Sequence, residues 1–119
     1  MNMITFFETS SGLSIKGEKM KFSEFDQTVI DMLREDHAFA VDYLKEAFIG
    51  LDGEDGEAMF LIAMRRLVEA RGGFTEIARA ANLNRETLYR TLSERGNPTI
   101  KTTKKVLHAV GIHFSEIAG

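Results

Sequence analysis

The sequence predicts an all-α protein, and three observations lead to this prediction. Apolar residues recur at three- and four-residue intervals through most of the stretch 22–110, which is the spacing of an amphipathic helix. The 119 residues include one proline, and the helix-favouring residues alanine, leucine, glutamate and arginine are frequent. Capping residues and glycines separate the periodic stretches. We therefore expect a single helical domain over residues 22–119, with residues 1–21 as a flexible extension in front of it.

The composition is that of an ordinary globular protein, with 44% hydrophobic and 28% charged residues. The chain has no cysteine, which excludes disulfides, thiolate chemistry and cysteine-bound zinc. No apolar run approaches the ~20 residues that a membrane helix needs, and residues 1–4 do not resemble the start of a secretory signal. These features favour a cytoplasmic protein with no membrane partner.

Three helices are predicted in the first half of the domain. Residues 22–34 and 37–49 have Ser23 and Asp36 as N-caps, and a third helix is expected over residues 57–71. The apolar positions that we expect these helices to turn towards the core are Phe25, Val29, Met32, Leu33, Val41, Leu44, Phe48, Met59, Phe60, Ala63, Met64 and Leu67. The glycines expected to end the second and third helices are Gly50, Gly72 and Gly73.

Two short helices joined by a tight turn are predicted over residues 74–93. Ile77, Ala78 and Ala81 share one face of the first helix. Ala78 is small enough to let two helices cross closely at that point. Asn82 follows, and asparagine tolerates the left-handed backbone conformation that such a turn requires.

The second helix of this pair has Asn84 as its N-cap and places Leu88 and Leu92 towards the core. This is the pattern of a DNA-binding helix-turn-helix, in which the second helix enters the major groove. The residues predicted to contact bases and nearby phosphates are Asn84, Arg85, Glu86, Thr87, Tyr89, Arg90 and Ser93. The alternative interpretation is an amphipathic helix with two solvated arginines and no DNA partner.

Further basic and hydroxyl residues flank the helix pair. The candidates for phosphate contacts are Thr75, Arg79, Arg95, Lys101, Thr102 and Lys104. A solvated helix surface would account equally well for the last three. A loop at 96–98 precedes a sixth predicted helix over 101–110, which Gly111 would end, and residues 112–114 suit either a short edge strand or a packed tail.

The charges are unevenly distributed along the chain. The net charge is −3, but residues 1–60 carry 5 Lys/Arg and 13 Asp/Glu, whereas residues 61–119 carry 10 Lys/Arg and 5 Asp/Glu. The basic half contains the helix pair at 74–93, where phosphate contacts would be needed. The acidic half suits a basic protein partner, although ordinary scatter in charge is the alternative explanation.

Catalytic and metal-binding patterns are not found in the sequence. The acidic stretch 52–57 lacks the alternating oxygen ligands and distal glutamate of a calcium loop. The histidines His37, His108 and His113 lack zinc-ligand spacing. No phosphate-binding glycine loop or nucleophile motif is present. We expect a protein that is not an enzyme and that uses neither a cofactor nor a metal.

Four segments, 70–78, 83–93, 96–98 and 106–111, together resemble the HigA-like addiction-module antidote proteins, within the wider Cro/repressor-type helix-turn-helix class. The most specific part is Arg-Glu-Thr-Leu-Tyr-Arg-Thr-Leu at 85–92 followed by Gly-Asn-Pro, and the Tyr-Leu-Lys-Glu-Ala segment at 43–47 is also similar. Many relatives have glycine in place of Asn82. The resemblance covers residues 25–114 and has no counterpart for the segment before Met20.

The resemblance implies a bacterial antitoxin that neutralises a small basic ribonuclease-type toxin and represses its own operon. It also implies a dimer that binds a double-stranded DNA operator through the exposed positions of the second helix. Two other hypotheses are also consistent with the sequence. One is a toxin-binding interaction module with weak DNA binding, and the other is an orphan phage-type transcriptional repressor without a toxin.

Overall fold

A computed structural model describes residues 21–118, and within that range it contains seven α-helices, one short 3-10 helix and no strand. The all-α prediction is confirmed. The elements are α1 (Glu24–Glu35), α2 (His37–Ile49), η1 (Gly50–Asp52), α3 (Gly56–Ala70), α4 (Phe74–Ala80), α5 (Arg85–Thr91), α6 (Ile100–Ala109) and α7 (Phe114–Ala118). Across residues 21–118, each helix is too short or too polar to pass through a bilayer. The flexible extension predicted at 1–21 lies almost wholly outside the described residues.

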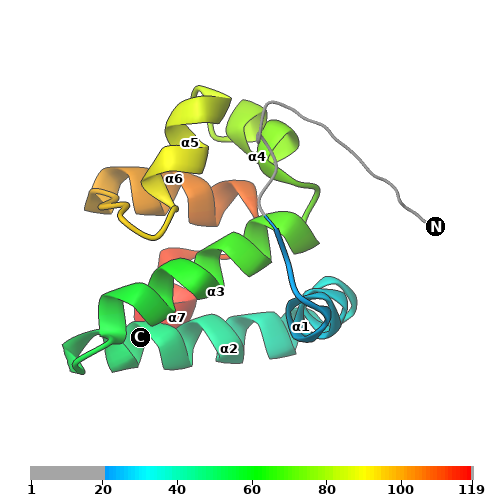
Figure 1. The fold of residues 1–119 in the computed structure, drawn as a ribbon, viewed down its shortest axis with the longest axis vertical. Helices are drawn as coiled ribbons and strands as arrows, with labels where there is room; N and C mark the ends of the chain where they lie inside the picture. Colours follow the sequence, from blue (N-terminus) through cyan, green and yellow to red (C-terminus); the bar gives the residue numbers. More distant parts are fainter. Residues whose placement is uncertain (1–20, 119) are drawn as a thin grey trace.

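Helix α3 crosses the middle of the molecule, and the other helices pack on its two sides (Figure 1). On one side, α1 and α2 pack against α3, and α7 lies against α2. On the other side lie α4, α5 and α6, with α4 in contact with α5 and α6. Helix α3 is correspondingly the most buried element, because its residues face neighbours on two sides. The acidic helices α1 and α2 and the helices α4 to α6 of the basic half therefore lie on the two sides of one continuous core, with α7 on the side of α2.

Local capping fixes where the first helices begin, as predicted. The Ser23 hydroxyl accepts a hydrogen bond from the Asp26 N–H at 3.0 Å, and the Asp26 carboxylate accepts one from the Ser23 N–H at 2.8 Å. This reciprocal pair satisfies backbone N–H groups that a helix start leaves without partners. Asp36 caps α2 in the same way, by accepting from the Phe39 N–H at 3.0 Å.

Three apolar residues predicted to face the core are instead exposed. The exposed fractions are 67% for Phe25, 46% for Met32 and 55% for Met59. On α1 the buried residues are Val29, Ile30 and Leu33. The buried side of the helix is therefore rotated by about one residue from the side on which Phe25 and Met32 lie. The spacing of apolar residues does not determine how a helix is rotated about its axis when adjacent positions are both apolar, because more than one apolar stripe can then face the core.

Gly50 ends α2 as predicted, but its φ of −76° lies in the right-handed region, and the chain continues into η1 without a left-handed stop. Two elements further along the chain differ from the prediction. Helix α6 begins at Ile100, because the Thr99 hydroxyl accepts from the Thr102 N–H at 3.1 Å. Residues 112–114 do not form the edge strand: Ile112 is buried as a packed connection and α7 begins at Phe114. Of the two alternatives for this tail, the packed one is found.

Gly96 lies in the loop that follows α5, and its position predicts a large effect of a single methyl group. A Cβ at Gly96 would collide with the carbonyl oxygen of Thr91, a backbone atom that cannot rotate away. Overpacking of this kind typically costs about 1–3 kcal/mol, so we expect Gly96→Ala to lower the free energy of unfolding by that amount in urea titrations. Gly50→Ala is the matched control, because no atom lies within 4 Å of a Cβ there. Equal stability of the two variants would contradict the expected collision.

Candidate nucleic-acid interface

The candidate site is α5, and its start is defined by Asn84. The Asn84 Oδ1 accepts hydrogen bonds from the backbone N–H groups of Glu86 at 2.8 Å and Thr87 at 3.1 Å. In the preceding turn, Asn82 has φ of +58°, the left-handed conformation predicted from its residue type. Because Asn84 uses its oxygen as the cap, its side-chain amide NH₂ is the part directed to other partners.

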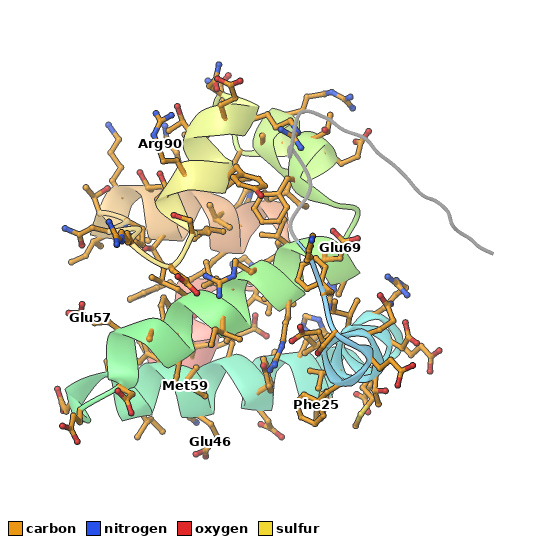
Figure 2. All side chains as sticks on the ribbon, in the orientation of Figure 1. Phe25, Glu46, Glu57, Met59, Glu69 and Arg90 are labelled. Carbon is orange, nitrogen blue, oxygen red and sulfur yellow. The ribbon has the colours of Figure 1, made fainter. Side chains whose placement is uncertain are left out.

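Burial orients α5 about its axis. Leu88 is fully buried and Leu92 is 1% exposed, as predicted, so the core-facing stripe of the helix is fixed. The opposite face exposes Glu86, Thr87 and Arg90, and Arg90 projects outward from the helix (Figure 2). One face of α5 therefore anchors the helix, while the other offers charged and polar groups to solvent.

Arg85 is held against two neighbours at the start of α5. Its Nε donates to the Thr75 hydroxyl on α4 at 3.2 Å, and its guanidinium carbon lies 5.8 Å from the centre of the Tyr89 ring. The Tyr89 ring in turn packs against Phe74 on α4, with 5.7 Å between the ring centres. Stacking of this kind favours one orientation of the guanidinium.

Five of the predicted residues line one shallow hollow of about 280 Å³ on α5, namely Arg85, Glu86, Tyr89, Arg90 and Ser93. The Ser93 hydroxyl donates to the backbone carbonyl of Arg90 at 2.7 Å, so it also closes the last turn of the helix. Five of the seven residues predicted to contact bases and nearby phosphates therefore share one surface, and Asn84 and Thr87 do not line it.

The phosphate candidates are more dispersed. Thr75 joins the site through its hydrogen bond with Arg85. Arg79 is exposed and forms an ion pair with Glu76 at 2.8 Å on the same helix. Lys104 has its ammonium 5.9 Å from the ring centre of Phe114 on α7, so it is directed towards α7.

The remaining three phosphate candidates lie around the loop and the start of α6. Arg95, in the turn after α5, and Lys101 are both exposed. Thr102 is half-buried, and its backbone N–H is already bonded to the Thr99 hydroxyl. The Thr102 N–H is therefore not available to an anion at the start of α6.

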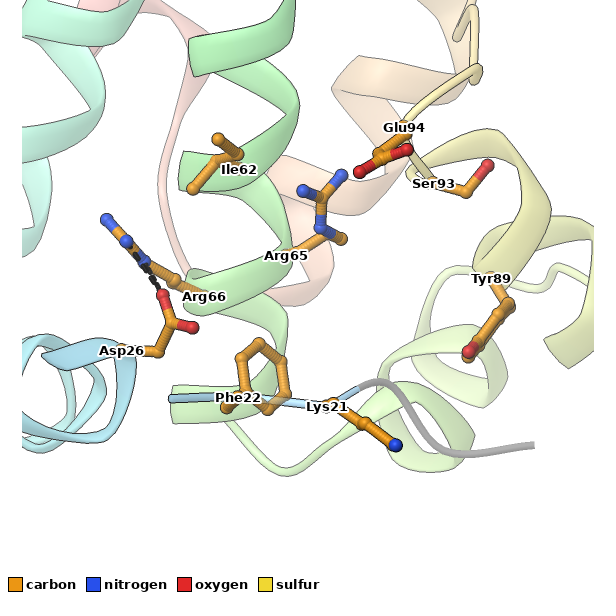
Figure 3. Close-up of a pocket in the computed structure, with 9 residues that line it drawn as sticks. All are labelled: Lys21, Phe22, Asp26, Ile62, Arg65, Arg66, Tyr89, Ser93 and Glu94. Atoms are coloured by element: carbon orange, nitrogen blue, oxygen red, sulfur yellow. Dashed lines mark hydrogen bonds and ion pairs between the residues drawn. The ribbon is translucent and has the colours of Figure 1, made fainter. Parts of the chain in front are cut away.

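Arg65 on α3 contacts α5 and was not predicted from the sequence. It donates from Nη1 to the carbonyl oxygen of Leu92 at 2.6 Å, which ties the C-terminal end of α5 to the central helix. It also lines a cleft of about 430 Å³ between α3 and α5 together with Tyr89, Ser93 and Glu94 (Figure 3). Burial lowers the pKa of Arg65, although nearby carboxylates act in the opposite direction and the group remains a cation.

Arg66, the next residue on α3, connects α3 to α1 and α2. Its Nε donates to Asp26 on α1 and its Nη1 donates to the Tyr43 hydroxyl on α2, both at 2.7 Å (Figure 3 shows the Asp26 contact). Burial alone would lower the pKa of Arg66, but these hydrogen bonds raise it above its ordinary value. The signal available in the sequence was the adjacent pair Arg65-Arg66 within an otherwise apolar stretch of helix.

Asp26 predicts how stability responds to acid. Its hydrogen bond from the Ser23 N–H, followed by its contact with Arg66, holds the pKa of Asp26 below the ordinary 3.8. A carboxylate with a depressed folded-state pKa stabilises the fold above its unfolded pKa, and this contribution disappears as pH falls through the folded pKa.

We therefore expect Asp26→Asn to destabilise the protein by about 1–3 kcal/mol at pH 7, and by progressively less as pH falls below 3.8. Urea unfolding at pH 7 and pH 3 measures the difference. Asp31→Asn is the control, because its ion pair with Arg34 is half-exposed and such pairs contribute about 0–1 kcal/mol. A destabilisation by Asp26→Asn that is independent of pH would contradict the charge-based explanation.

Residues 21–118 match a family described as "Probable addiction module antidote protein". The match extends over nearly the whole domain, including α3, α5 and the loop after α5. The chain belongs to this family. Addiction-module antidotes, or antitoxins, are regulatory proteins and not enzymes, which agrees with the expectation from the sequence. The part of the predicted resemblance that concerned antidote proteins is therefore confirmed at the level of the family.

A curated relative from Haemophilus influenzae, named "Uncharacterized protein", is 41% identical over 61 residues. That alignment covers 51% of the antidote-family chain and 62% of the relative, so the two are similar over somewhat more than half of the relative's length. No solved structure matches the chain.

Proposed function

We propose that this antidote-family protein is a DNA-binding antitoxin that neutralises a cognate ribonuclease-type toxin and represses its own operon. In this proposal α4 and α5 form a Cro/repressor-type helix-turn-helix, and α5 is the recognition helix. The observation that carries the proposal is the constrained geometry of α5. Its core face is fixed by Leu88 and Leu92, its start by Asn84 and its end by Arg65.

The exposed face of α5 has the chemistry that base recognition requires. Arg90 and Arg85 can each donate two hydrogen bonds to a guanine, and the Asn84 amide can donate to base or phosphate acceptors. Glu86 can accept from cytosine and would disfavour a nearby phosphate. Thr75, at the start of α4, and Arg95, after α5, flank this face and are candidates for the two phosphate backbones.

A dimer is the form that we expect to bind DNA. Two recognition helices related by a two-fold axis would read half-sites about 34 Å apart, so the operator would be a palindrome. The net charge of −3 makes non-specific binding weak, because it opposes attraction to phosphates outside the basic surface. We expect a marked preference for the DNA upstream of the gene over unrelated DNA.

The test uses the full chain and a DNA fragment from immediately upstream of its own gene. We expect a gel shift at low salt, protection of a palindrome in footprinting, and an affinity that falls as salt rises. In parallel, co-expression with the product of the adjacent reading frame should restore growth that this product inhibits alone. Failure to bind the upstream fragment at low salt would eliminate the DNA-binding part, and failure to restore growth would eliminate the antitoxin part.

The toxin-binding interaction module remains the second candidate, because the surface of α1 and α2 is acidic and would repel DNA. The same two assays separate it from the first proposal. The interaction module would be favoured if co-expression restores growth but the purified chain, without the adjacent product, does not shift the upstream fragment. A shift of that fragment without any toxic neighbour would favour the orphan repressor.

A further inference from the structure

An apolar groove of about 420 Å³ lies between α2 and α3. Its walls include Tyr43 and Ala47 from α2 and Met59 and Ala63 from α3. Figure 2 shows Met59 between the ribbons of α3 and α2. Met59 is 55% exposed, although methionine on a central helix is ordinarily covered. The groove is therefore an apolar surface open to solvent.

A further exposed apolar residue, Phe25 on α1, lies near the groove, and the guanidinium of Arg66 lies between Phe25 and the groove wall. Tyr43, at the groove wall, accepts a hydrogen bond from Arg66, and the guanidinium of Arg66 lies 5.3 Å from the centre of the Phe25 ring. Phe25 is 67% exposed. Scattered single apolar residues on a surface are ordinary, whereas an apolar groove with a further exposed aromatic ring near it is typical of an interaction site. We call the groove together with Phe25 the strip. The residues that the sequence wrongly assigned to the core, Phe25 and Met59, are the exposed parts of this strip.

Acidic groups border the strip. Glu46 and Asp55 line the groove, and Glu46 lies on the outer side of α2 in Figure 2. The surrounding residues 21–60 carry 11 Asp/Glu but 3 Lys/Arg. Of these three cations, Lys21 lines the cleft between α3 and α5, Arg34 is paired with Asp31, and Lys45 lies on α2 but does not line the groove. The field around the groove is therefore strongly negative.

We propose that the α2–α3 groove is the docking surface for the cognate toxin, and that the toxin presents an apolar ridge flanked by lysine and arginine. This inference rests on the antitoxin function proposed above and specifies its surface. Buried apolar contacts with Met59 and Tyr43 supply affinity, while Glu46 and Asp55 attract the basic flanks and exclude acidic partners. The groove lies on the opposite side of α3 from α5, so toxin and DNA use different faces.

Two other occupants fit less well. Residues 1–20 of this chain carry two lysines and two glutamates, so they have no net charge to complement the acidic border. A second copy would have to place its basic α4–α6 side in the groove, which is a head-to-tail contact. Such contacts extend into open chains unless the rotation closes, and they would cover α5.

The experiment measures binding of the purified chain to the product of the adjacent reading frame by calorimetry or surface plasmon resonance. The test variant is Glu46→Lys with Met59→Lys, which reverses one border charge and removes one exposed apolar group. The matched control is Glu35→Lys with Ile100→Lys, because Glu35 is exposed on α1 and Ile100 is 75% exposed on α6. Thermal unfolding and upstream-DNA binding of each variant confirm that the fold is retained.

We expect the groove variant to bind the adjacent product with a Kd raised by about tenfold or more. The Kd of the control variant should stay within about twofold of the wild type. The association rate of the wild type should fall as the salt concentration rises. Binding by the groove variant equal to the wild type would overturn the groove assignment and leave the antitoxin function intact. A wild type that does not bind the adjacent product would overturn both. Concentration-dependent polymers that the groove variant abolishes would assign the groove to a second copy.

Discussion

Replacing Arg85 and Arg90 together by alanine is expected to weaken binding to the upstream DNA by a factor of about thirty or more. Each arginine that donates two hydrogen bonds to a base contributes about 1–3 kcal/mol of recognition, and 1.4 kcal/mol corresponds to about a factor of ten in Kd. Both side chains line the same hollow on α5. Quantitative gel shifts at one fixed salt concentration measure the loss.

The matched control is Arg34→Ala with Lys45→Ala, which also removes two positive charges but from α1 and α2. Arg34 is half-exposed on α1 and Lys45 lies on α2, away from α5. If net charge alone governed binding, the two double variants would lose affinity equally. Thermal unfolding of the α5 variant is also needed, because Arg85 contacts Thr75 and Tyr89. DNA binding that survives in the α5 variant would refute α5 as the recognition helix.

Leu88→Ala is expected to lower the free energy of unfolding by about 2–5 kcal/mol, the usual cost of truncating a fully buried leucine. Leu88 has no exposed surface and lies in the core that α3, α4 and α6 share. Helix α5 has seven residues, which is too short to be stable by itself. Its position therefore depends on this packing, and DNA affinity should fall in proportion to the fraction of unfolded chains.

Thr87→Ala is the control for Leu88→Ala, because Thr87 is the adjacent exposed residue on the same helix. Exposed substitutions usually change stability by no more than about 0.5 kcal/mol. Urea unfolding followed by circular dichroism gives both values. A Leu88→Ala variant as stable as Thr87→Ala would mean that α5 does not depend on the core for its position.

The contacts of α3 give a physical basis for a rigid platform beneath α5. Arg65 bonds to the end of α5, and its neighbour Arg66 bonds to α1 and α2. Two consecutive residues of α3 therefore connect the acidic helices α1 and α2 to α5. The proposed toxin surface and the proposed DNA surface share this central helix while facing away from each other.

The sequence by itself determined the features that depend on interactions within a few residues. The caps formed by Ser23, Asp36 and Asn84 were predictable, because a capping side chain bonds to backbone two or three residues ahead. The left-handed Asn82 follows from the intrinsic preference of asparagine. The core positions Leu88 and Leu92 follow from helix spacing once α5 is recognised.

Only the tertiary structure decided which of several adjacent apolar residues is buried and which distant groups meet. Phe25 and Met59 fit a helical stripe, but the packing of α1 and α3 leaves them exposed. Arg65 meets Leu92 across 27 residues of sequence, and Arg66 meets Asp26 across 40. Helix periodicity specifies a face but not the neighbour that covers it, because that neighbour is set by how all the helices pack together.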